Sequence, residues 1–252
     1  MDALRFTTSG SAGWTNILLC GVLYLSTQVI PILGLIVMMG FFAEVHRRLV
    51  LQHPNPYLRF DFSDLGPYLS RGVAPLVMGL VLAIPFVFLF VGLGIAVAIA
   101  ASTGAASLGG GSEETVVLIG FGGAAVLFLP ISLFWLALAN AATTRAELTG
   151  DLSKSFNLGA IWSYAARTWK RVLITSFLMW FVAVGLMIVG LIACIVGMFV
   201  TMSMLYIASL HVRWQIYNEY LLEGGEPIEL APWENLPSEA QRAPVYAAPP
   251  IR

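Results

Sequence analysis

Charged residues are scarce in this chain. Lys, Arg, Asp and Glu make up 11% of its 252 residues, whereas 58% of the residues are hydrophobic. A soluble domain contains about 25% charged and about 45–50% apolar residues. Four stretches contain no charged residue at all, and they are residues 6–43, 72–112, 115–144 and 172–212. Uncharged apolar stretches of such length are typical of membrane-spanning helices, so an ordinary soluble globule is excluded.

Cysteine and histidine are also rare, which bears on cofactors. Cys20 and Cys194 lie within apolar stretches, and the three histidines do not have the spacing of metal ligands. We therefore expect no disulfide framework, no metal and no cofactor. A net charge of −1 provides no basic field for binding nucleic acid.

Catalytic motifs are absent as well. The sequence has no phosphate-binding loop, no nucleophile elbow and no HExxH zinc motif. Its apolar stretches hold only neutral polar residues, so we predict no catalytic residue and no enzyme activity. Among these neutral residues, Gln28, Ser132 and Asn140 are candidates to line a path for a substrate. Their alternative role is to form hydrogen bonds between helices.

The apolar stretches predict an all-α polytopic membrane bundle. Pro31 lies near the middle of the first stretch, which forms either one long kinked helix or two short helices that turn back at this proline. The last stretch is too long for one helix, and Gly190 and Gly197 predict a tight turn between two. Five transmembrane helices follow from the first alternative and six from the second. The membrane stretches are 15–42, 73–101, 115–142 and 172–212.

The basic residues predict the orientation of the bundle. Nine of the 13 Lys and Arg residues lie in two connecting loops, residues 45–71 and 143–171. Cytoplasmic loops retain such residues, so we expect both loops and the C-terminus on the cytoplasmic side of the inner membrane. The N-terminus is outside if the first stretch is one helix and inside if it is a hairpin. Five of these basic residues are candidates to bind anionic lipid head groups, or else only orient the chain: Arg47, Arg48, Arg167, Lys170 and Arg171.

The two basic loops resemble each other. Asp64-Leu65 and Asp151-Leu152 are each followed, after six residues, by a glycine. Asp64 (or Ser63) and Asp151 are suited to cap a helix N-terminus. Each loop is therefore predicted to contain a short interfacial helix on the cytoplasmic membrane surface.

The composition changes near residue 222. Residues 1–13 form an N-terminal segment, and residues 14–222 form the transmembrane helical domain. Residues 223–252 are rich in Pro and Glu. Such a segment buries little apolar surface, so we predict an acidic, disordered C-terminal tail.

Short motifs along the chain resemble a known family. In the first half they are Trp14-x-x-Ile17-Leu18, Pro31-Ile32-Leu33, Gly40 before Arg47-Arg48, Asp64-Leu65-Gly66 and Gly72; in the second half they are Leu129-Pro130, Thr149-Gly150-Asp151-Leu152, Ser155-Phe156 and the helix with His211. Over residues 12–222 the chain resembles the prokaryotic membrane proteins catalogued as domain of unknown function four thousand and thirteen. The resemblance implies a multi-helix membrane fold, and it brings no established activity, cofactor or catalytic residue.

Two functions remain as hypotheses. The first is a non-catalytic integral membrane protein that serves as an accessory or assembly subunit of a membrane complex, with the lipid bilayer and membrane proteins as partners. The alternative is a small transporter or lipid-handling membrane protein.

Overall fold

The computed structural model describes residues 2–8, 12–107, 113–232, 234 and 236–240, and every regular element in this part of the chain is helical. The all-α prediction is confirmed. In chain order the elements are α1 Asp2–Thr7, α2 Gly13–Ser26, α3 Pro31–Val50, the 3-10 helix η1 Phe62–Asp64, α4 Leu65–Ser107, α5 Glu113–Thr149, α6 Leu152–Ser155, α7 Leu158–Ile192, α8 Cys194–Leu222 and α9 Pro237–Ala240.

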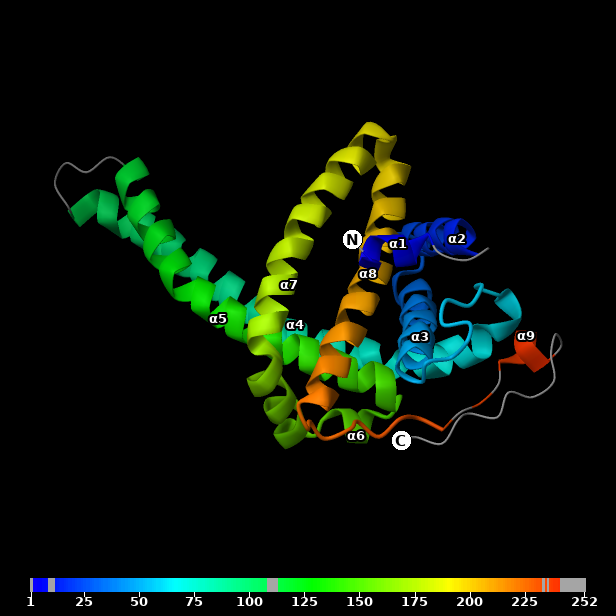
Figure 1. Cartoon of the computed structure of the whole chain (residues 1–252). Helices are drawn as coiled ribbons and strands as arrows, with labels where there is room; N and C mark the ends of the chain where they lie inside the picture. The colour runs from blue at the N-terminus through cyan, green and yellow to red at the C-terminus, as the bar shows by residue number, and fades with distance from the viewer. Residues whose placement is uncertain (1, 9–11, 108–112, 233, 235, 241–252) are drawn as a thin grey trace.

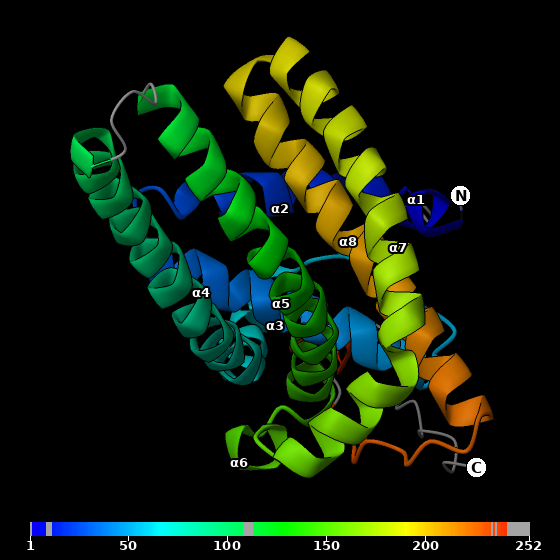
Figure 2. The same ribbon diagram turned by 90° about the vertical axis from the view of Figure 1, so that its left-hand side faces the viewer.

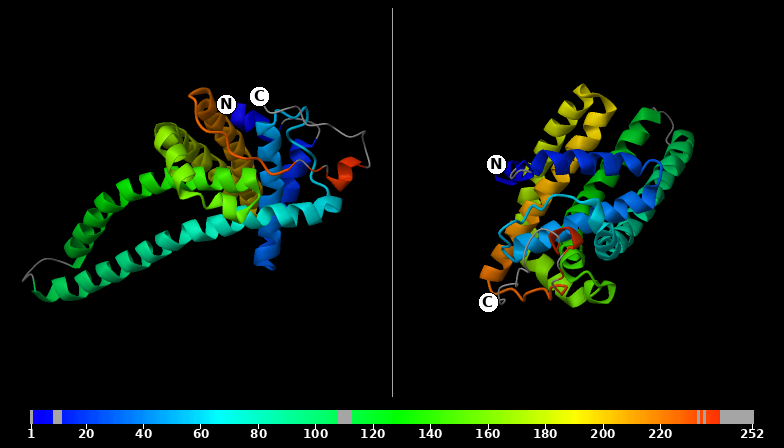
Figure 3. Two further views of the ribbon diagram at one scale, coloured as in Figure 1. Left: turned by 90° about the horizontal axis from the view of Figure 1, so that it is seen from below. Right: turned by 90° about the vertical axis from the view of Figure 1, so that its right-hand side faces the viewer.

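Two long helical hairpins dominate the shape of the molecule. The hairpin of α4 and α5 and the hairpin of α7 and α8 rise from a common base and diverge from each other (Figures 1 and 2). We call the end where α6 and the segment after α8 lie the base. Helix α3 packs against α4 near the base, and α2 lies further from the base against α8, where Gly21 meets Val200 (Figure 3).

Two helical segments are long and apolar enough to cross a membrane. They are Phe62–Phe88, with 27 residues, and Leu158–Ile192, with 35 residues. Only 22% and 6% of their most apolar windows are buried. The core helix of a soluble protein would be mostly buried, so these two helices present their apolar side chains outward.

The first apolar stretch forms two helices, so the hairpin alternative describes it. Helix α2 ends at Ser26, and α3 begins at Pro31 and packs against α2. Ile30 has φ −127° and ψ 79°, which lies outside the α-helical region that a following proline disfavours. Pro31 itself occupies the first turn of α3, where its missing N–H costs no hydrogen bond.

The predicted turn in the last apolar stretch is confirmed. Helix α7 ends at Ile192 and α8 begins at Cys194. A Cβ on Gly197 would lie 2.6 Å from the carbonyl oxygen of Gly190. The two helices can therefore meet at this turn only because both positions lack a side chain.

Glycines also bring α3 and α4 together at the base. A Cβ on Gly40 would collide with the carbonyl oxygen of Tyr68, and a Cβ on Gly72 would collide with the carbonyl oxygen of Ile36. The two backbones thus touch directly. Small residues permit such an approach in membrane helices, which gives a structural reason for two of the glycines in the family motifs.

One of the two predicted helix caps is formed. The Asp151 carboxylate accepts hydrogen bonds from the N–H groups of Ser153 and Lys154 and caps α6, as predicted. At the first loop Asp61 caps η1, whereas Asp64 has a different role described below. Helices α4 and α7 begin within the loops and continue without a break, so the predicted interfacial segments are the first turns of long helices.

The segment after α8 differs from the prediction of a disordered tail. Its described part runs along the base to α9 (Figure 1), and we call this part, residues 223–232, 234 and 236–240, the strap. Ile228 and Leu236 are buried, and the Ile228 N–H donates to the hydroxyl of Tyr217 over 2.9 Å. The Ala231 N–H donates to the carbonyl of Leu148 over 2.9 Å. The predicted disorder of residues 241–252 falls outside the described residues.

Candidate functional site

A cluster of buried and half-buried ionisable side chains joins four helices at the base. We call it the base cluster, and its members are Glu44, His46, Arg47 and Arg48 from α3, Arg71 from α4, Glu147 from α5 and Arg213 from α8. Buried ionic groups are costly unless they are paired and hydrogen-bonded. The ion pairs and hydrogen bonds within the base cluster therefore decide whether it stabilises the fold.

Glu44 is the centre of one half of the cluster. One carboxylate oxygen accepts from Arg48 Nε over 2.8 Å. The other accepts from Arg71 Nη1 over 2.6 Å and lies 3.3 Å from Arg47 Nη2. Glu44 and Arg48 are 0% exposed. One buried carboxylate thus holds three guanidinium groups, two from its own helix and one from α4.

Glu147 is the centre of the other half. Its carboxylate oxygens lie 2.6 Å from Nδ1 of His46 and 2.7 Å from Nη1 of Arg213. An ionised carboxylate can only accept, so Nδ1 of His46 carries the proton of that hydrogen bond. Burial opposes ionisation of Glu147, but Arg213 and His46 outweigh it and hold the pKa of this carboxyl below its ordinary value of 4.5.

This depressed pKa predicts acid sensitivity. A carboxyl whose pKa is lower in the folded than in the unfolded protein stabilises the fold above the unfolded value, and this contribution is lost as the pH falls through the folded value. The unfolding temperature of the protein in detergent should therefore begin to fall below about pH 4.5. Glu147→Gln should unfold at a lower temperature at neutral pH and show a weaker pH dependence. An identical pH profile in the wild type and this variant would contradict the assignment.

The strap is anchored to the same region. Arg47 Nη1 donates to the carbonyl of Pro232 over 3.0 Å, and Arg71 Nη2 donates to the carbonyl of Glu234 over 3.3 Å. The buried Asp64 carboxylate accepts from the N–H and the hydroxyl of Ser238 over 2.9 and 2.6 Å. Asp64 thus binds the strap beside the base cluster.

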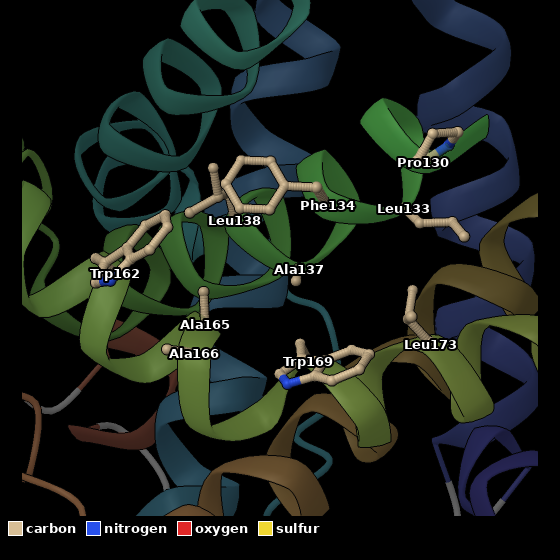
Figure 4. Close-up of a pocket in the computed structure, with 10 residues that line it drawn as sticks. All are labelled: Pro130, Leu133, Phe134, Ala137, Leu138, Trp162, Ala165, Ala166, Trp169 and Leu173. Atoms are coloured by element: carbon tan, nitrogen blue, oxygen red, sulfur yellow. The ribbon is translucent and has the colours of Figure 1, made fainter. Parts of the chain in front are cut away.

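Two cavities lie above the base. A cavity of about 330 Å³ opens between α5, α7 and α8, and most of its lining is apolar. We call it the polar cavity because its lining also includes seven residues with polar side chains: Asn140, Thr143, Thr175, Ser176, Tyr206, Ser209 and Arg213. A larger apolar groove of about 470 Å³ lies between α5 and α7 (Figure 4). Among the described residues, no group of three or more His, Cys, Asp or Glu side chains could hold a metal ion.

The comparison with known families covers most of the chain. Residues 23–210 match the family described as Protein of unknown function (DUF4013). The chain belongs to this family. No curated protein and no solved structure matches the chain. The DUF4013 match includes Glu44, Arg71 and Glu147 but ends before Arg213 and the strap.

The structure does not bring together the three predicted lining residues of this DUF4013 chain. Asn140 lies in the polar cavity, and its Oδ1 is buried without a hydrogen-bond donor among the described residues. Gln28 is exposed in the connection between α2 and α3, and Ser132 lies on α5 outside the lining of the polar cavity. A shared path around all three is therefore not formed.

The five basic residues proposed as lipid contacts separate into two groups. Arg47 and Arg48, at 2% and 0% exposure, point into the base cluster, so their guanidinium groups do not reach lipid in this conformation. Arg167 and Lys170 are exposed, and Arg171 is paired with Glu219 and Glu223 of α8. Lipid contact stays a prediction for these three residues of α7.

Sequence reasoning missed Glu44, Glu147 and Arg213 as site residues. Each lies just beyond an apolar stretch, which is where interfacial charged residues also lie. The sequence does contain one signal for Glu44, because Arg48 follows it at the i,i+4 spacing of a helical ion pair. Nothing in the sequence shows that Arg71 of α4 meets this pair or that Glu147 of α5 joins His46 of α3 to Arg213 of α8.

Proposed function

We propose that this chain is a non-catalytic integral protein of the inner membrane that serves as an accessory or assembly subunit of a membrane complex. Helices α4, α5, α7 and α8 cross the bilayer, and the base lies in the cytoplasm. This orientation is supported by the basic residues, nine of which lie in the two loops at the base.

The α2–α3 hairpin enters the membrane in this proposal without crossing it. With 14 residues, α2 is about 21 Å long, which is less than the bilayer core of about 30 Å. Val29, Ile30, Ile32 and Leu33 at its turn are exposed and apolar. A turn in water would be polar, so this turn lies in lipid. The five or six crossings expected from the sequence thereby become four crossings and one re-entrant hairpin.

One observation supports the accessory role most directly. The end of the α4–α5 hairpin that lies far from the base is separated from the other helices. Beyond the base this hairpin stands apart from α7 and α8 (Figures 1 and 2). Phe88, Val91 and Ile95 on α4 are exposed, and no other described element lies within 4 Å of where a Cβ would be on Gly92 or Gly94. Small residues allow close packing of membrane helices, and no described residue occupies that packing position. A helix of a partner protein fits against it.

Gly92→Leu tests this role. The substitution meets open space in the structure, so the variant should fold and insert normally. A leucine would keep a partner helix from approaching closely, and we expect the share of protein in a discrete membrane complex to fall by about tenfold. Native electrophoresis of gently solubilised source membranes measures this share.

Gly79→Leu is the matched control, because Gly79 also faces open space on α4 but lies beside Met78 in the packed part of the bundle, outside the isolated end of the hairpin. This variant should remain in the complex. A wild-type protein that migrates alone would contradict the accessory role. Specific solute flux through liposomes that contain only this protein, abolished by Asn140→Leu, would favour the transporter hypothesis, for which the polar cavity is the site.

A further inference from the structure

The apolar groove between α5 and α7 has the form of a binding site for a lipid chain. Pro130, Phe134 and Leu138 of α5 form one wall, and Trp162 and Trp169 of α7 form the other (Figure 4). The Phe134 and Trp162 rings lie 5.7 Å apart between centroids. The volume of about 470 Å³ lies within the range of small-molecule sites.

The position of the groove matches the boundary between lipid heads and lipid chains. Trp162 and Trp169 are 57% and 46% exposed, and they precede the apolar stretch that begins at Val172. Tryptophans concentrate at membrane interfaces, where the ring contacts apolar chains and its N–H contacts polar groups. From these tryptophans the groove extends to Leu173 and Pro130, toward the membrane interior.

The ammonium group of Lys170 lies at the edge of the groove, beside the Trp169 ring. Lys170 Nζ lies 5.6 Å from the centroid of the Trp169 ring. Two other basic residues nearby have acidic partners, since Lys154 pairs with Glu229 and Arg171 pairs with Glu219, whereas Arg167 donates to the carbonyl of Gly224. No carboxylate among the described residues pairs with Lys170. Its ammonium group is therefore available to an anion outside the protein.

We propose that the groove binds one acyl chain of an anionic phospholipid, with the lipid phosphate beside Lys170. The chain packs between Phe134 and the two tryptophans, and the ammonium group selects the charged head. This inference rests on the membrane insertion of the proposed function and is independent of the accessory role.

Quenching of tryptophan fluorescence by brominated lipids tests the site. The full-length protein is reconstituted in phosphatidylcholine vesicles that contain a minor fraction of either phosphatidylglycerol or phosphatidylcholine with brominated chains. We expect brominated phosphatidylglycerol to quench at about fivefold lower concentration, because one lysine near the membrane surface contributes about 1 kcal/mol to binding an anionic lipid. The double variant Trp162→Phe/Trp169→Phe should remove most of this selective quenching, because both tryptophans line the groove.

Lys170→Gln should make the two brominated lipids equally effective, whereas Lys154→Gln, which changes a paired lysine at the base, should leave the preference unchanged. Equal quenching by both lipids in the wild type would overturn the site but not the membrane insertion. A preference retained in Lys170→Gln would overturn the role of this lysine. Absence of quenching by either lipid would overturn the membrane insertion itself, and loss of the partner complex would affect none of these results.

Discussion

Glu44→Gln is expected to destabilise the protein by about 3–5 kcal/mol. The substitution keeps the shape of the side chain but removes the negative charge that Arg47, Arg48 and Arg71 share. Removing one partner of a buried ion pair leaves charge in a medium of low dielectric constant, and this cost exceeds that of most single substitutions. Denaturant-induced unfolding in detergent micelles measures the change.

Glu229→Gln is the control for this effect. Glu229 pairs with Lys154 at the surface, where both side chains are largely exposed. An exposed pair contributes less than about 1 kcal/mol, so this variant should unfold almost as the wild type does. If the two variants lost equal stability, the base cluster would not be the ionic centre of the fold.

Gly72→Ala is expected to have an effect of similar size for a different reason. The added methyl group would collide with the backbone of α3 at Ile36. A carbonyl oxygen of a helix cannot rotate away as a flexible side chain can, so the two helices must separate. Overpacking typically costs about 1–3 kcal/mol and occasionally more, and the rigid contact here places the cost at the upper end, about 3 kcal/mol. Thermal unfolding in detergent provides the measurement.

Gly79→Ala separates this collision from a general effect of alanine. Gly79 lies two turns further along α4 with no other described element within 4 Å of where its Cβ would be. Alanine favours a helix over glycine by about 0.5–1 kcal/mol, so this variant should be equal to or slightly more stable than the wild type. A destabilised Gly79→Ala or a tolerated Gly72→Ala would contradict the α3–α4 crossing.

Local signals in the sequence predicted several elements correctly. The lack of charge marked the long helices, Gly190 and Gly197 marked the turn between α7 and α8, and Asp151 marked the start of α6. These features depend on residues close together in the chain. The break at Pro31 was one of two alternatives, because a proline within an apolar stretch is compatible with a kink and with a turn.

The base cluster could not be predicted because its partners are distant in sequence. Glu147 meets His46 across 101 positions and Arg213 across 66. In the sequence alone, each of these side chains resembles a solvated residue at the end of a helix. The same limitation applies to Arg47 and Arg48, whose positions suggested contact with lipid head groups but whose guanidinium groups are turned inward.

The strap escaped prediction for a related reason. Its composition is polar and rich in proline, and a segment of this kind cannot fold alone. It is ordered because the rest of the protein provides acceptors and donors, as Asp64 does for Ser238 and Tyr217 does for Ile228. Amino-acid composition indicates whether a segment can fold alone. It does not show whether the rest of the protein provides a surface on which the segment becomes ordered.

Cysteine accessibility tests the central claim, that the long helices cross a membrane with the base in the cytoplasm. Single cysteines at Ser153 in α6 and at Ala193 between α7 and α8 are introduced into a chain with Cys20 and Cys194 replaced by alanine. A membrane-impermeant maleimide should label position 193 in intact cells and position 153 only after the membrane is permeabilised. Equal labelling of both positions in intact cells would contradict the crossing, and the reverse pattern would contradict the orientation.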